Sequence, residues 1–342
     1  MTGLDRYIRQ TVFAEFGIEG QRGLGRSRVL LVGCGALGSA IAVSLVRSGI
    51  RELTIVDQDF PEMTNLHRQF LYEENDVRQK IPKAVAAAQK LARANSTVKI
   101  IPQVTELTAN NIEKLARGKD LILDGTDNLE TRYLINDYCV KHVRPWIYGG
   151  VIGASGMMMV IFPGQSACLR CLFPEPPAPG SLPTCASAGV LNPAPMLIGA
   201  LEAIAAIKYL SGRGQPRPGL LQFDLWGEHM AMIRVQRQPR CPACGQHKFE
   251  FLAKKQTEWS ARVCGKNAMK IIPPRDQRLN LRALGAKLAR LGKAKFNGWL
   301  IEAESKGRKI IIFADGRAVI HQIADARRAI SLYHKFLGNR EG

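Results

Sequence analysis

Three glycines lie between an apolar run and a helical segment near the N-terminus, at Gly33, Gly35 and Gly38. Glycines at this spacing let a phosphate approach the backbone amides at the start of a helix. Asp57 ends the next apolar run, where a carboxylate can bind a ribose. This pattern is most often that of an NAD or FAD site, although glycines can also serve only helix–strand packing. The loop predicts a nucleotide site without identifying the nucleotide.

The polar residues that follow are unusual for a dehydrogenase and favour ATP. They occur as Asp57-Gln-Asp59, Asn65-Leu-His-Arg68-Gln69, Pro82-Lys83 and Asp124-Gly-Thr-Asp127-Asn128. Arginine and lysine neutralise the charge that moves when a triphosphate reacts. A carboxylate such as that of Asp127 suits a Mg²⁺ ion that also contacts phosphate oxygens.

Four of the eight cysteines form two Cys-x-x-Cys pairs, Cys168 with Cys171 and Cys241 with Cys244. Four thiolates complete the tetrahedral coordination of Zn²⁺ and leave no open position, so the pairs predict a structural zinc site. Redox pairs or free thiols are the alternative. Of the other cysteines, Cys34, Cys139 and Cys264 are interpreted as packing residues.

Alternating strands and helices must position these groups. The expected strands are 28–33, 53–57, 98–102 and 120–124, and the helices between them are 39–48, 83–94 and 110–117. Such alternation is typical of an α/β fold with a Rossmann-like, mostly parallel sheet and helices on both faces. A proline-rich loop at 173–183 and a long helix at 195–210 follow.

The 342 residues are 46% hydrophobic and 23% charged, which excludes disordered and fibrous classes. The net charge of +19 is uneven, because residues 1–250 carry 28 basic and 22 acidic side chains and residues 251–342 carry 20 and 7. We expect an ATP-binding domain over 1–250 and a small basic α+β domain over 251–342. The basic surplus indicates either an acidic protein or nucleic acid as partner, or a merely solvated surface.

The cellular location of the protein can be inferred from its N-terminal residues, its longest uncharged stretch and its cysteines. Three charged residues occur within the first ten positions, so no secretory signal is expected, and the uncharged stretch 145–169 contains glycines and prolines that do not suit a membrane span. Cysteines in such a chain suggest metal binding or catalysis rather than disulfides. We expect a cytoplasmic protein.

In their order, the motifs resemble the ThiF/MoeB/HesA family, the prokaryotic relatives of ubiquitin-activating enzymes, and most closely the ThiF type. The resemblance covers about residues 4–250 and includes Arg6-Tyr-Ile-Arg9-Gln10 and Thr184-Cys185-Ala-Ser-Ala-Gly189. It implies an adenylyltransferase that uses ATP to activate the C-terminal glycine of a ubiquitin-like sulfur carrier ending in Gly-Gly. The sulfur donor would be a separate protein. A ThiS-like carrier of thiamine biosynthesis is favoured; a MoaD-like carrier of molybdopterin synthesis or a tRNA-thiolation carrier would use the same chemistry.

The resemblance also implies residue roles. Asp57 would bind the ribose, and Arg68 and Lys83 the phosphates. Asp127 would bind Mg²⁺ or position the reacting carboxylate. Arg9 would reach the triphosphate from the other subunit of a homodimer, and Cys185 would either take part in sulfur or acyl transfer or only pack. The ATP-binding set as a whole is Gly33, Gly35, Gly38, Asp57, Asp59, Asn65, Arg68, Lys83, Asp127 and Asn128.

Three other functions fit part of the sequence. An ATP-dependent tRNA dehydratase of the same superfamily would suit the basic charge, but the cysteine pairs and the 184–189 motif argue against it. An NAD-dependent oxidoreductase is supported by the glycine loop alone. A non-catalytic adaptor would bind the carrier without activating it, and the complete set of charged residues argues against that function.

Overall fold

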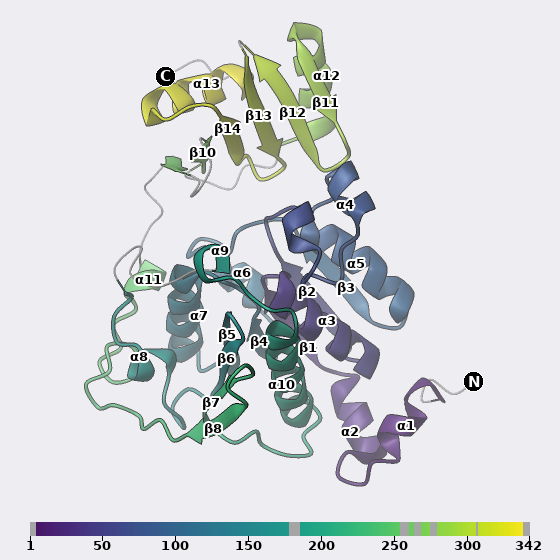
Figure 1. The fold of residues 1–342 in the computed structure, drawn as a ribbon, viewed down its shortest axis with the longest axis vertical. Helices are drawn as coiled ribbons and strands as arrows, with labels where there is room; N and C mark the ends of the chain where they lie inside the picture. Colours follow the sequence, from purple (N-terminus) through teal and green to yellow (C-terminus); the bar gives the residue numbers. More distant parts are fainter. Residues whose placement is uncertain are drawn as a thin grey trace. The chain divides into compact units, whose positions relative to one another are not determined.

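In a computed structural model, the chain divides into two compact units, Met1–Lys254 and Lys255–Gly342 (Figure 1). The structure describes residues 5–177, 185–253, 260–262, 268–273, 279–305 and 307–337. Each unit has its own sheet and its own hydrophobic core.

The first unit is built on an eight-stranded sheet in the order β3-β2-β1-β4-β5-β6-β7-β8. Its strands are β1 (Arg28–Val32), β2 (Glu52–Val56), β3 (Lys99–Gln103), β4 (Leu121–Asp124), β5 (Trp146–Ile152), β6 (Ser155–Ile161), β7 (Gly219–Asp224) and β8 (His229–Ile233). The strands from β3 to β5 are parallel, and β6, β7 and β8 extend the sheet as antiparallel strands.

Helices cover both faces of this sheet because its central strands are apolar on both sides. One face packs against α3 (Ala36–Ser48), α5 (Lys83–Ala94) and α10 (Pro193–Leu210), and the other against α6 (Ile112–Ala116), α7 (Leu129–Lys141) and α8 (Leu169–Leu172). The predicted fold class is therefore confirmed. The short helices are η1 (Asp5–Tyr7), α1 (Ile8–Thr11), α2 (Gly17–Leu24), η2 (Met63–Asn65), α4 (Glu74–Gln79), α9 (Cys185–Ala188) and α11 (Glu250–Ala253).

Among the described helices, α10 alone is long and apolar enough to cross a membrane. A core helix passes the same test, and α10 packs against α3, β5 and β6. Its buried residues, such as Ile198 and Ala206, belong to the core on that face of the sheet.

The strand order reverses between β1 and β4, and the site residues gather at this point. β1 pairs with β2 on one side and with β4 on the other, and Val32 lies opposite both Val56 and Asp124. The segments that follow β1, β2 and β4 therefore begin side by side at the same edge of the sheet. In open α/β sheets, ligands bind in the crevice outside such a switch point.

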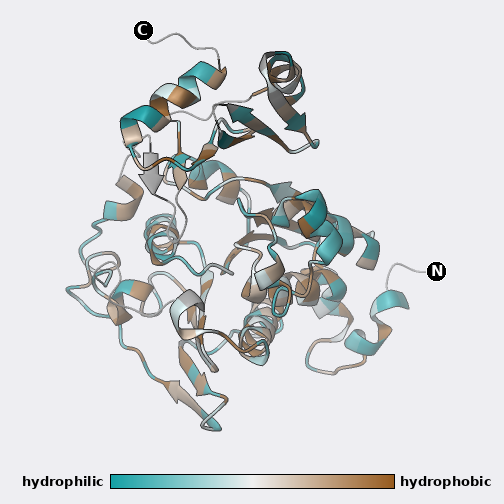
Figure 2. Cartoon of the chain, turned by 45° about the horizontal axis from the view of Figure 1, so that its top comes forward, coloured by the Kyte–Doolittle hydropathy of each residue, from teal (hydrophilic) through white to brown (hydrophobic). Residues whose placement is uncertain are grey.

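The second unit is an antiparallel sheet of six strands with two helices on one face. The sheet has the order β11-β12-β13-β14-β10-β9. Its elements are β9 (Ser260–Arg262), β10 (Ala268–Ile271), α12 (Leu281–Leu291), β11 (Lys293–Phe296), β12 (Leu300–Ser305), β13 (Arg308–Phe313), β14 (Ala318–His321) and α13 (Ala326–Leu337). Helix α13 carries both hydrophilic and hydrophobic residues (Figure 2). Its hydrophobic residues Tyr333 and Phe336 belong to the core of this unit.

Candidate functional site

The glycine loop after β1 packs directly against the turn after β4. Gly33 has a φ of 83°, and a Cβ atom there would lie 2.7 Å from the carbonyl oxygen of Gly125. A Cβ atom on Gly38 would lie 2.1 Å from the carbonyl oxygen of Gly33. Gly33 and Gly38 thus serve the packing role that the sequence raised as an alternative. Gly125, which the sequence did not single out, completes the contact.

Gly35 differs from the other two glycines because the space around it is open. A Cβ atom there would come no closer than 3.5 Å to a heavy atom, Nε2 of Gln69. Gly35 is also the residue that precedes α3, and in the part of the chain that the structure describes no side chain caps this helix. The first backbone N–H groups of α3 are therefore available to a phosphate.

Asp57 connects the end of β2 to the glycine loop. Its buried carboxylate accepts hydrogen bonds from the backbone N–H of Cys34 at 2.7 Å and of Asp59 at 2.8 Å. Burial raises the pKa of Asp57 to about 6, and the positive charge of Lys83 opposes this rise. Oxygen lone pairs that these two bonds do not use are available to a ribose hydroxyl.

Lys83 is the first residue of α5, and its buried side chain lies near the carboxylates of Asp57 and Asp59. Its Nζ lies 3.3 Å from Oδ2 of Asp59, and its backbone N–H donates to the carbonyl of Asp59. Burial acts to lower the pKa of Lys83, but Asp57 and Asp59 outweigh it, so the pKa lies above the ordinary value. Asp127 adds to the same effect. Lys83 is therefore a fixed cation at the edge of the crevice.

A buried ion pair holds the turn after β4. Asp124 is fully buried and accepts hydrogen bonds from Nε of Arg132 at 2.9 Å and from the backbone N–H of Thr126 at 2.9 Å. Asn128 caps α7, because its Oδ1 accepts from the backbone N–H of Glu130 at 2.9 Å. Asp127 remains exposed between these fixed residues. Our sequence reasoning missed Arg132, although an arginine one turn into a helix that follows a buried Asp is a recognisable signal.

Arg68 and Asn65 hold the loop between β2 and α4. Nη1 of Arg68 donates to the carbonyl of Thr64 at 2.9 Å, and Oδ1 of Asn65 accepts from the backbone N–H of Glu62 at 3.2 Å. Among the described contacts, the hydrogen bonds of both side chains stay inside this loop. Arg68 is half-buried, so its guanidinium keeps donors for a ligand.

Arg9 lies at the far end of α3 from the glycine loop. Nε2 of Gln10 donates to the carbonyl of Ser48, the last residue of α3, at 3.1 Å. The 13 residues of α3 span about 20 Å, which is longer than an arginine side chain. The Arg9 of one chain therefore does not reach the glycine loop of the same chain.

The two cysteine pairs come together as one cluster. The four Sγ atoms of Cys168, Cys171, Cys241 and Cys244 lie within 4.8 Å of one another. Neighbouring Sγ atoms are 3.4 to 3.9 Å apart, whereas tetrahedral zinc with Zn–S bonds of about 2.3 Å requires about 3.8 Å. A disulfide would need about 2.0 Å. The donor set and its spacing fit Zn²⁺.

The remaining cysteines differ in how much the structure says of them. Cys34 and Cys139 are fully buried, and burial raises the pKa of the Cys34 thiol to about 12, so both fit the predicted packing role. Cys185 begins α9, but its side chain lies outside the described part of the chain, as does all of Cys264.

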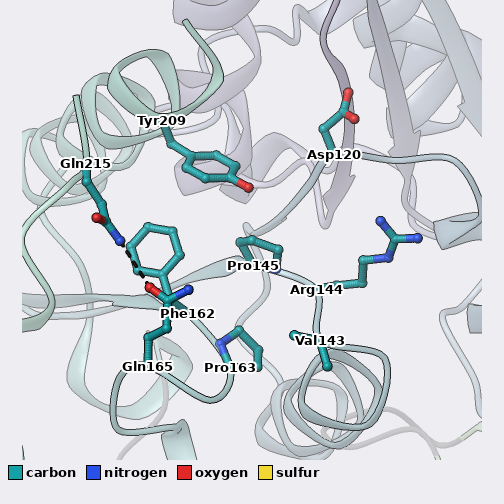
Figure 3. Close-up of a pocket in the computed structure, with 9 residues that line it drawn as sticks. All are labelled: Asp120, Val143, Arg144, Pro145, Phe162, Pro163, Gln165, Tyr209 and Gln215. Carbon is teal, nitrogen blue, oxygen red and sulfur yellow. Dashed lines mark hydrogen bonds between the residues drawn. The ribbon is translucent and has the colours of Figure 1, made fainter. Parts of the chain in front are cut away.

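A cavity of about 350 Å³ lies at the opposite edge of the sheet (Figure 3). Its lining includes Asp120 and Pro145, which precede β4 and β5, and Tyr209 from the end of α10. Gln215 donates to Gln165 across one side of it. These residues stand at the amino ends of the parallel strands, so the cavity is separate from the switch-point crevice.

Glu202 on α10 is a buried carboxyl group close to the site. It is fully buried, and within the described residues neither of its oxygens has a hydrogen-bond partner. Its Oε1 would lie only 1.9 Å from a Cβ atom on Gly149 of β5. Burial, with a smaller contribution from Asp124, raises the pKa of Glu202 well above 4.5.

The raised pKa of Glu202 predicts that the free energy of unfolding falls as the pH rises. The folded chain binds the Glu202 proton more tightly than the unfolded chain, so this stabilisation is complete below the unfolded pKa. Above it, the free energy of unfolding falls by up to about 1.4 kcal/mol per pH unit until the folded pKa is passed. Denaturant titrations between about pH 5 and pH 8 should show this loss in the wild type relative to Glu202→Gln. Exposed Glu19→Gln is the control, and parallel curves for wild type and Glu202→Gln would refute the assignment.

The sheet order, the glycine loop at the switch point and the buried side chains of Asp57 and Lys83 define a Rossmann-like nucleotide-binding protein. The profile of the ThiF family matches residues 7–243, and the chain belongs to this family of ATP-using adenylyltransferases. The predictions of the family and of ATP in place of NAD are thereby confirmed.

Two relatives and one solved structure are similar to this chain. It is 39% identical over 341 residues to a protein named "Sulfur carrier protein ThiS adenylyltransferase" from Bacillus subtilis, covering 99% of this chain and 100% of the relative. It is 40% identical to "Sulfur carrier protein adenylyltransferase" from Thermus thermophilus, covering 71% and 91%. Escherichia coli MccB with ATP has a TM-score of 0.63 at 22% identity, covering 71% and 75%, which shows the shared fold.

Proposed function

We propose that this enzyme uses ATP to adenylate the C-terminal glycine carboxylate of a ubiquitin-like sulfur carrier, with a ThiS-like carrier of thiamine biosynthesis as its substrate. The match to the Bacillus subtilis ThiS adenylyltransferase over nearly the whole of both chains carries this proposal. The first unit is the adenylyltransferase domain, and the second is a basic extension. The sulfur donor is a separate protein, and the enzyme works in the cytoplasm.

The reaction needs positioning and charge stabilisation from the protein. A carboxylate oxygen of the carrier attacks the α-phosphorus of ATP, and the bond from that phosphorus to the pyrophosphate oxygen breaks. The products are the acyl adenylate and pyrophosphate. Lys83 and Arg68 would balance the phosphate charge, Asp57 would bind the ribose, and the first backbone N–H groups of α3 would contact a phosphate. Cys185 would act after adenylation, in sulfur or acyl transfer.

Two metals belong to the proposal. The exposed carboxylate of Asp127, within electrostatic reach of Lys83, suits Mg²⁺ bound to ATP, which supplies positive charge at the phosphates. The four-cysteine cluster would hold Zn²⁺ in a structural role, because four thiolates leave no coordination position for a substrate.

The ATP–pyrophosphate exchange reaction tests the function. Labelled pyrophosphate should appear in ATP when the enzyme is given a ThiS-like carrier ending in Gly-Gly. A carrier that lacks the last glycine is the control, and a MoaD-like carrier tests the second pathway. Exchange with the MoaD-like carrier alone would move the enzyme to molybdopterin synthesis. No exchange with any carrier, from folded protein, would refute the proposal.

The basic second unit gives nucleic acid as a further candidate partner. Exposed cations lie along α12 at Arg282, Lys287 and Arg290. Nucleic-acid binding through them would weaken steeply with salt. Exchange that needs no RNA, together with salt-independent carrier binding, would speak against such a role.

A homodimer would complete the site with Arg9 from the partner chain. The distance along α3 separates Arg9 from the site of its own chain. Large apolar side chains are exposed beside it, with Ile8 57%, Val12 72% and Phe13 60% exposed, as expected for a surface that another copy covers.

Mixed dimers provide a direct prediction about Arg9. Arg9→Ala and Lys83→Ala should each abolish exchange, because each removes one cation from every site. Mixed in equal amounts and allowed to exchange subunits, they should recover about one quarter of wild-type activity, because half of the dimers carry one intact site of two. The matched control mixes Asp127→Ala with Lys83→Ala, which should recover nothing. Equal failure of both mixtures would contradict a contribution across the dimer.

A further inference from the structure

Arg132 joins three segments beneath the proposed active site. Its Nε donates to Oδ2 of Asp124 at 2.9 Å, at the end of β4. Its Nη2 donates to the carbonyl oxygen of Thr126 at 2.5 Å, in the turn, and to that of Gly149 at 2.8 Å, in β5. The guanidinium is buried and lies 5.2 Å from the centre of the Tyr148 ring. A single planar group therefore fixes the turn to two strands.

Asp124 holds the same turn from the other side. Its Oδ1 accepts from both the backbone N–H of Thr126 at 2.9 Å and its Oγ1 at 2.7 Å. The Asn128 cap fixes the end of the turn on α7. Asp127 is the one exposed residue between the fixed Thr126 and Asn128, so the backbone that carries its carboxylate has little freedom.

Stability alone does not explain why the pair is buried. A buried ion pair contributes little compared with apolar residues of the same volume, because both charges lose their hydration. Glu202 lies on the other side of Gly149, and burial raises its pKa, which favours the uncharged carboxyl group. It then does not compete with Asp124 for Arg132. The charge of Arg132 is thus directed to the turn.

We propose that Arg132 is a positioning residue for adenylation: with Asp124, it holds the 124–128 turn so that Asp127 faces the ATP phosphates. This inference rests on the proposed function. Arg132 would act through Asp127 and touch neither ATP nor the carrier.

Arg132→Lys tests the inference because it keeps the charge and loses the planar group that makes three hydrogen bonds. We expect kcat for carrier-dependent exchange to fall about 10–100-fold, since a misplacement of about 1 Å can cost that much. KM for ATP should rise by no more than it does in Asp127→Ala, because the glycine loop, Asp57 and Lys83 remain. The matched control is Tyr133→Phe, the next residue of α7, which loses a hydrogen bond to the carbonyl of Phe173 and should keep its kcat.

A double-mutant cycle separates positioning from simple destabilisation. If Arg132 acts through Asp127, then Arg132→Lys should cost little further activity in an Asp127→Ala background. Losses that multiply, an unchanged kcat, or a raised KM alone would each overturn the inference. Should Arg132→Lys fail to fold, Thr126→Val removes one hydrogen bond to Asp124 and should show the same coupling with a smaller loss.

Measurements of ATP binding can test the role of Arg132 even if the proposed function is wrong. A wild-type protein without exchange contradicts the proposed function, but calorimetric titration with ATP can still be done with and without Mg²⁺. Arg132→Lys should then lose the Mg²⁺-dependent part of the affinity, as Asp127→Ala should. Full retention of that part in Arg132→Lys would refute the positioning role.

Discussion

Asp127→Ala should lower kcat for carrier-dependent ATP–pyrophosphate exchange by about 10²–10³-fold, a typical loss for a group that stabilises charge in a transition state. The side chain is exposed, and its charge contributes to the raised pKa of Lys83, so it lies in the electrostatic field of the site. An exposed residue of this kind changes the free energy of unfolding by about 0.5 kcal/mol or less. Activity should therefore be lost from a fully folded protein.

Glu130→Ala is the matched control for this prediction. Glu130 is also exposed and acidic, and it lies in the first turn of α7, three residues beyond Asp127. It should keep exchange within about threefold of wild type, whereas Asp127→Ala should not. Equal activity in the two variants would show that the negative charge of Asp127 does not serve the reaction.

Removal of zinc should have the second large effect, and it should act on stability. The purified protein should contain about one Zn²⁺ per chain, and Cys171→Ser should lose it. The cluster joins α8, which begins at Leu169, to the 241–244 segment, and the cysteines that face each other, Cys168 with Cys241 and Cys171 with Cys244, are 73 residues apart in the chain. Because structural zinc contributes directly to folding free energy, we expect several kcal/mol of lost stability and a fall in Tm on the order of 10 °C or more.

Cys139→Ala separates the loss of zinc from the loss of any buried thiol. Cys139 is fully buried in α7 and lies outside the four-cysteine cluster. This variant should keep its metal and lose about 1–2 kcal/mol for the cavity. Wild-type protein that is folded and free of metal would refute the zinc assignment, as would Cys171→Ser that keeps both its zinc and its Tm.

The elements of the fold follow from the sequence because their signals are local. Apolar runs and helical periodicity predicted β1, β2, β3 and β4 and the helices α3, α5 and α6, and the helix expected at 83–94 is α5. The parallel strand β5 and the helix α7 before it were not predicted. The starts of α3 and α10 were placed late, at 39 and 195 in place of 36 and 193. Gly38 lies in the first turn of α3, and Pro193 and Pro195 lie in the first turn of α10. Both residue types are disfavoured inside helices, so the sequence pattern suggested later starts, although proline is common in the first turn.

The chemistry of the site was also readable in part. The residue types that bind phosphate, ribose and metal stand next to strand ends, and strand ends meet at one edge of a parallel sheet. Two Cys-x-x-Cys pairs predict a four-thiolate cluster because few other roles need four cysteines at that spacing. Asp57 and Lys83 both lie beside the glycine loop and Asp59, and the four cysteines come together in a cluster of their own.

Contacts between distant residues were decided only by the tertiary structure. It shows that glycine is needed at Gly33 and Gly38 because the turn at Gly125 packs against them, and that Arg132 is bonded to Asp124. It also shows that Glu202 is buried with no hydrogen-bond partner among the described residues. It also places Arg9 a helix length from the glycine loop of its own chain. Periodicity and spacing determine which elements form and which ligands they can offer. Which side chains meet depends on packing across the sheet, and no local pattern records it.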